Sequence, residues 1–140
     1  MKHTNIEQLD FIRRVHVKTP PQHIMDAGND KSRLLFENPL CGFTCGDNSI
    51  SVREAMRERG EIDWQVVAGY AFAPKQRIPT AHVWVRHGPT HYDPTWVLWE
   101  WTPERLRYYE LVEPLLITKN DSLAPLRRIA VEHGLALTET

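Results

Sequence analysis

The sequence has few of the features that mark secreted, membrane or disulfide-stabilised proteins. It contains only two cysteines in 140 residues, so a framework of disulfides is excluded as the basis of the fold. No apolar run approaches the roughly 20 residues that span a bilayer. The segment Met1–Asp10 lacks the apolar stretch of a secretory signal. We therefore expect a cytoplasmic protein with reduced thiols, or an effector exported without a signal peptide, and no membrane partner.

An excess of charge of one sign is also missing. Lysine and arginine together number 17 and the acidic residues 18, which gives a net charge of −1. A dedicated nucleic-acid binder usually carries a basic stripe, so we expect no nucleic-acid partner. The length fits one domain, and we predict a single domain over residues 1–140.

The pattern of apolar residues and of helix and strand formers predicts helices and a strand meander. Helices are expected over 5–17, 45–59 and 122–133, and strands over 63–72, 78–86, 91–97 and 105–112. The stretch 22–40 is expected to be mostly loop, with a short helical turn near 24–27 or 32–36. Separate runs of helices and antiparallel strands indicate an α+β fold.

Cys45 stands at the start of the second predicted helix. Thr44 is a suitable N-cap for this helix, and Gly60 ends it. The first turn of a helix has unpaired amides and a partial positive charge, which favour a thiolate and can bind an oxyanion. A free cysteine is also commonly a small buried hydrophobe, so this position alone leaves both interpretations open.

The next two strands predict where a histidine and an aspartate lie. If Gly88-Pro89 is a two-residue loop, Arg86 faces His91 across the hairpin. His82 and Asp93 then share one face of the sheet as diagonal neighbours. A carboxylate there can accept the imidazole Nδ1–H and leave Nε2 free for a thiol proton. A three-residue loop would place the aspartate on the opposite face.

Four segments, taken in order, resemble a known group of enzymes. Cys-Gly-Asp-Asn-Ser opens the second helix, and Ala-Gly-Tyr-Ala-Phe, Ala-His-Val-Trp-Val and Tyr-Asp-Pro-Thr-Trp follow (Cys45–Ser49, Ala68–Phe72, Ala81–Val85, Tyr92–Trp96). This succession resembles the papain-like and transglutaminase-like cysteine enzymes, especially small bacterial and phage members. The resemblance covers about residues 42–96.

The resemblance implies a papain-like core in which a central helix packs on an antiparallel sheet. It implies that Cys45 is the nucleophile, His82 the general base and acid, and Asp93 the residue that orients the imidazole. The implied activity is that of a cysteine hydrolase or acyltransferase without a cofactor, acting on an amide bond of a protein or peptide. A peptidase is the first choice, and a glutamine deamidase or transglutaminase is the second. The alternative is an inactive fold that serves as a protein-binding module in a phage or effector protein.

Further residues are candidates for binding the substrate or the oxyanion. Papain has a glutamine several residues before its cysteine that helps to bind the oxyanion, and this chain has none there. Asn38 or the backbone amide of Cys45 can take that role, and Asn48 can line the site or cap. Trp84 is expected in the core or the cleft floor, and Trp99 in a partly exposed stretch that can contact the substrate.

Metal binding is the main rival interpretation. His82, His87 and His91 lie close together in the sequence, and the two cysteines offer thiolates. However, His87 lies at the hairpin turn and points away from the face of His82, and the usual paired metal-binding motifs are missing. We therefore expect no metal site. A turn could also allow a disulfide between Cys41 and Cys45, but we expect Cys41 to be a packed or spectator thiol.

Overall fold

The computed structural model describes residues 5–118 and 123–138 of the chain. Helices and strands are mixed in the order η1 (Ile6–Gln8), β1 (Ile12–Val15), β2 (Val17–Lys18), α1 (Gln22–Phe36), α2 (Cys45–Glu58), β3 (Trp64–Phe72), β4 (Thr80–His87), β5 (Thr90–Tyr92), η2 (Trp96–Trp99), η3 (Pro103–Arg105), β6 (Arg107–Leu111) and α3 (Ala124–Glu132). The described part of the chain thus confirms the α+β class.

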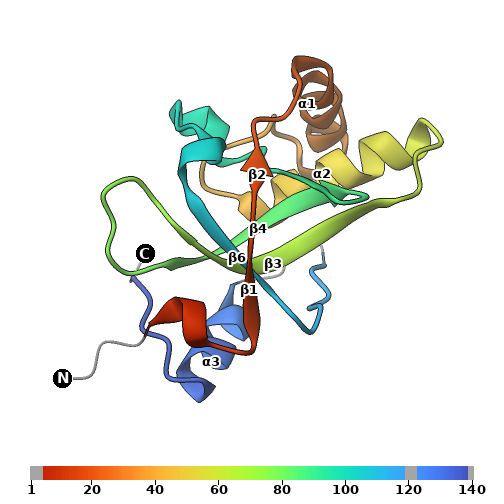
Figure 1. The fold of residues 1–140 in the computed structure, drawn as a ribbon. Coiled ribbons are helices and arrows are strands. Elements are labelled where there is room, and N and C mark those ends of the chain that lie inside the picture. The colour runs from red at the N-terminus through yellow and green to blue at the C-terminus, as the bar shows by residue number, and fades with distance from the viewer. Residues whose placement is uncertain (1–4, 119–122, 139–140) are drawn as a thin grey trace.

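One sheet contains the six strands in the order β1-β6-β3-β4-β5-β2. All neighbours are antiparallel except β2 and β5. Strands β1 and β2 are separated only by His16, yet they lie at the two ends of this order. Figure 1 shows them as one nearly straight run across the other strands. The N-terminal segment therefore curls the sheet round on itself.

The curled sheet has two apolar faces. One is enclosed by the curl and contains a buried cluster of mostly large side chains (Val17, Val67, Ala71, Trp84, Trp96, Tyr108). The other is covered by helices, with α2 packed on β3 and β4 and α1 packed on α2. Gly28 allows the two helices to approach closely, because a Cβ there would lie 2.8 Å from Val52 Cγ2.

Two of the expected elements are wrong. The predicted helix over 5–17 is instead the short η1 followed by β1 and β2. Its β-branched residues pair with β6 and β5, and this long-range pairing outweighs the helical spacing. The expected loop over 22–40 contains the 15-residue helix α1. Its Gly28-Asn29-Asp30 run suggested a turn, but burial of Ile24 and Met25 against α2 stabilises the helix.

The remaining elements are confirmed with shifted ends. Helix α2 begins at Cys45 as predicted, and β3, β4 and β6 lie within two residues of their expected starts. The last strand of the hairpin is much shorter than expected, because the chain turns into η2 after Tyr92. Helix α3 begins at Ala124, and residue 122 of the prediction lies outside the described residues.

Candidate active site

A pocket of about 750 Å³, here called the thiol pocket, opens where α2 begins. Cys45, the first residue of α2, and His82, from β4, both line it. Thr95, Trp96 and Trp99 from the segment after the hairpin complete one wall. Two of the three residues predicted for catalysis therefore reach one pocket from separate elements.

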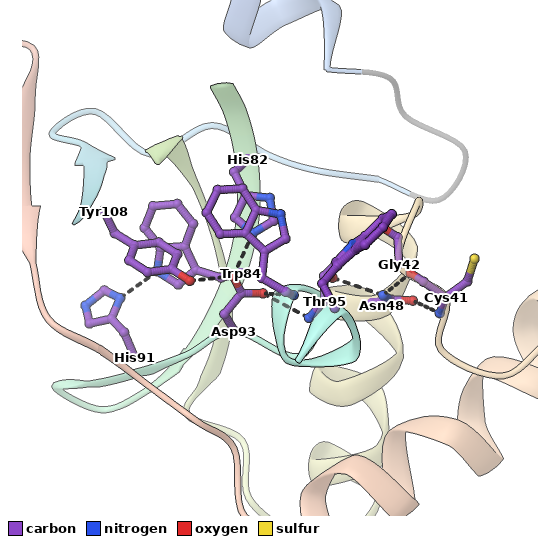
Figure 2. A network of polar contacts seen from close by, with 11 residues as sticks. Cys41, Gly42, Asn48, His82, Trp84, His91, Asp93, Thr95 and Tyr108 are labelled. Carbon is purple, nitrogen blue, oxygen red and sulfur yellow. Dashed lines mark hydrogen bonds and ion pairs between the residues drawn. The ribbon is translucent and has the colours of Figure 1, made fainter. Parts of the chain in front are cut away.

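The β4–β5 hairpin has the predicted register. Arg86 pairs with His91, and Gly88-Pro89 is a two-residue loop in which Gly88 has a φ of +58°. Asp93 follows β5 directly, and its Oδ2 lies 2.8 Å from His82 Nε2 (Figure 2). The prediction that Nδ1 faces the aspartate is wrong, because the ring presents Nε2 instead. Nδ1 is thus the nitrogen left for the thiol.

Asp93 is completely buried and held by hydrogen bonds on both oxygens. Oδ1 accepts from the backbone amides of Thr95 at 2.9 Å and Trp96 at 3.1 Å, while Oδ2 also accepts from Tyr108 Oη at 2.7 Å. Burial raises the pKa of this carboxyl, but the charge of His82 and these hydrogen bonds outweigh it, so the pKa is lowered. The carboxylate is therefore ionised and fixed in place.

His82 is buried between charged and aromatic partners. Burial lowers its pKa, but the charge and hydrogen bond of Asp93, and then a hydrogen bond with Cys45, raise it to about 10. The ring stacks on Trp96 with centroids 4.1 Å apart and planes at 21°. The buried carboxylate therefore favours the protonated form of the ring, which lines the same pocket as the Cys45 sulfur.

Asn48 links the two halves of the site. Its side chain is 1% exposed, and Nδ2 donates to Cys41 O at 2.7 Å and to Thr95 Oγ1 at 2.9 Å. Its Oδ1 accepts from Cys41 N at 3.2 Å (Figure 2) and from Thr44 Oγ1, also at 3.2 Å. These bonds tie the loop before Cys45 to the segment after Asp93, and Asn48 does not line the thiol pocket.

Thr44 precedes α2 as expected, but its side chain does not cap the helix. The hydroxyl donates to Cys41 O and Asn48 Oδ1 instead. The amides of the first turn are consequently not capped by this residue.

The other candidates are distributed over three environments. Trp99 lines the thiol pocket, and its Nε1 donates to Gly42 O at 3.0 Å. Trp84 is fully buried and donates to His91 Nδ1, so it belongs to the core and does not line the pocket. Asn38 is exposed, donates to Phe36 O and lines a different pocket from Cys45.

Two residues of the site were not singled out from the sequence. Tyr108 is one of these, and its burial against Asp93 follows from which face of β6 is enclosed. Gln76 is the one side-chain amide among the described residues that line the thiol pocket. It lies in the β3–β4 loop, whose path no sequence pattern defines.

The histidines that suggested a metal site have separate surroundings. His87 Nε2 lies 3.0 Å from Asp63 Oδ1, and its ring stacks on Trp64. His91 is buried, which lowers its pKa, and it accepts the indole N–H of Trp84. Within residues 5–118 and 123–138, no group of three or more histidine, cysteine, aspartate or glutamate residues is arranged so that it could hold a metal ion.

Comparison of the chain with protein-family models, with curated proteins and with solved structures gave no match. In the described part of the chain, no helix combines the length and apolar character needed to cross a membrane.

Proposed function

We propose that the protein is a cysteine hydrolase or acyltransferase with a papain-like core and a Cys45–His82–Asp93 triad. The observation that carries this proposal is the buried 2.8 Å contact between His82 and Asp93 beside a cysteine at a helix start. A buried carboxylate that fixes an imidazole next to a nucleophile is the arrangement that covalent acyl transfer requires.

In the proposed reaction, the proton of Cys45 lies on His82 Nδ1, and the Cys45 thiolate attacks the carbonyl carbon of an amide. The C=O π bond opens, and the carbonyl oxygen takes the negative charge. The amides at the start of α2 stabilise that oxyanion. The C–N bond then breaks, and His82 gives its Nδ1 proton to the leaving amine, so that a thioester remains. Water attacks the thioester and His82 takes a proton from it. The C–S bond then breaks, the carboxylic acid leaves, and the Cys45 thiolate and the His82 imidazolium are restored.

The leaving group and the acceptor distinguish a peptidase from a glutamine deamidase or transglutaminase. Both are determined by the cleft, since the triad chemistry is the same. A thiol pocket of about 750 Å³ has room for a large side chain beside the scissile carbonyl. We therefore propose a protein or peptide substrate and place peptidase first.

The two cysteines allow an internal test with iodoacetamide. Both thiols are partly exposed, so the reagent can reach each of them. We expect Cys45 to be alkylated at pH 6 at least about 10-fold faster than Cys41, because an imidazolium lies beside only one of them. Peptide mass spectrometry of a single labelled sample gives the ratio directly.

His82→Gln supplies the matched control, because the amide retains a hydrogen bond to Asp93 but carries no charge. In this variant the two cysteines should react at similar rates. If His82→Gln leaves the preference for Cys45 unchanged, the triad is wrong and an inactive protein-binding module becomes the better account.

A further inference from the structure

The thiol pocket continues into a second pocket of about 450 Å³, here called the basic pocket. Ala73, Gln76 and Trp101 line both, so the two form adjoining parts of one surface. The two pockets differ in the polarity and charge of the side chains that line them. This difference bears on which substrate side chains can lie beside Cys45.

The thiol pocket is apolar and aromatic. Among the described residues that line it, none is an aspartate, glutamate, lysine or arginine. The Trp99 ring makes an edge contact with Phe43 at 5.2 Å and a stacked contact with Trp101 at 5.7 Å, measured between ring centroids. Phe43 is 82% exposed and Trp99 42% exposed. Such partly exposed rings beside a reactive group favour a bulky uncharged side chain.

The basic pocket carries three cations and one carboxylate, Lys75, Arg105, Arg107 and Glu100. None of the three cations forms an ion pair with a described carboxylate, and the Arg107 guanidinium lies 3.9 Å above the Phe72 ring. Lys75 has a φ of 65°, a left-handed backbone conformation that residues other than glycine and asparagine rarely adopt. Lys75 lines the basic pocket from the loop between β3 and β4.

We propose that the cleft selects peptide segments in which a bulky apolar side chain stands beside an acidic one. The apolar side chain occupies the thiol pocket next to Cys45, and the carboxylate faces Lys75 and Arg105. This inference rests on the proposed function, because it assigns a substrate class to the same site. Unpaired cations at a cleft attract an acidic partner and repel a basic one.

Reactive peptides test this selection without knowledge of the natural substrate. Each peptide carries a central diaminopropionate with a chloroacetyl group, from which the Cys45 sulfur displaces chloride. Phenylalanine flanks the centre on both sides, followed by aspartate or by lysine. In low salt we expect the aspartate peptide to label Cys45 at least about 10-fold faster than the lysine peptide. Replacing phenylalanine by alanine should slow labelling by a similar factor.

Variants assign each preference to its pocket. Lys75→Gln combined with Arg105→Gln should reduce the aspartate-over-lysine ratio to about 2 or less. The matched control is Arg33→Gln combined with Arg59→Gln, which removes the same charge from exposed positions that line neither pocket and should keep the ratio. Trp99→Ala should reduce the phenylalanine-over-alanine ratio, with each rate divided by the iodoacetamide rate of the same protein.

The outcomes separate the two proposals. If iodoacetamide labelling depends on His82 but the aspartate and lysine peptides react equally fast, this inference is overturned and the proposed function stands. Retention of the ratio in the Lys75/Arg105 variant overturns it as well. If labelling is indifferent to His82, the proposed function fails whatever the peptides show.

Discussion

The two cysteines lie four residues apart, yet they face different pockets. Cys45 lines the thiol pocket with His82, whereas Cys41 lines a third pocket, distinct from the thiol pocket and the basic pocket, with Asn38, Thr44 and Asp47. Among the described residues that line this third pocket there is no histidine. The reactivity proposed for one thiol therefore depends on the imidazole that the β4–β5 hairpin brings to it. The position of Cys45 at the start of α2, which Cys41 does not share, adds to this difference.

The largest expected effect is a loss of activity when Cys45 is removed, and the comparison of the two cysteines fails if removal of Cys41 causes the same loss. We expect Cys45→Ala to reduce kcat/KM for a peptide anilide by roughly 10³-fold or more, because the nucleophile is gone. Cys41→Ala should stay within about 2-fold, because Asn48 binds the backbone of Cys41 and not its sulfur. Steady-state kinetics decide, and loss of activity in Cys41→Ala would contradict the assignment.

Asp93→Asn tests the comparison by removing the negative charge beside the His82 imidazole. With the carboxylate gone, burial of His82 is opposed only by the weaker influence of Cys45. Its pKa should fall from about 10 towards or below the ordinary value of about 6.5. We expect kcat to fall roughly 10²–10⁴-fold, and NMR titration of the ring to show the lower pKa. An unchanged titration would mean that Asp93 does not set the charge of His82.

Asn48→Ala tests the connection between the two sides. Losing its buried hydrogen bonds should reduce the free energy of unfolding by about 1–3 kcal/mol and reduce selective labelling of Cys45. Asn38→Ala is the matched control, since this exposed side chain makes one local contact and should change stability by less than about 0.5 kcal/mol. Chemical denaturation measures both, and equal effects would contradict this connection.

Tyr108→Phe should give the smallest effect. It removes one of the hydrogen bonds that lower the pKa of Asp93, so this pKa should rise. The acid limb of the pH–rate profile should therefore move to higher pH. We expect kcat to fall by about 2–10-fold, in line with one hydrogen bond. Tyr109→Phe is the control, because that hydroxyl donates to Glu7. A shift common to both variants would argue against a specific role.

The site was more predictable than the fold around it. The loop Gly88-Pro89 and strand alternation were enough to bring His82 and Asp93 together, because hairpin register is a local property. The N-terminal strands were missed because their partners, β5 and β6, lie more than 70 residues away. The nitrogen that faces Asp93 could not be predicted either, since ring orientation depends on stacking against Trp96 and on Tyr108.

The most direct test of the account is the titration of His82 in the absence of each thiol. The sulfur of Cys45 contributes to the raised pKa of His82. We therefore predict that Cys45→Ala lowers the pKa of the His82 ring, measured by NMR, while Cys41→Ala leaves it unchanged. Identical titration curves for the wild-type protein and Cys45→Ala would show that thiol and imidazole are not coupled, which would contradict the account.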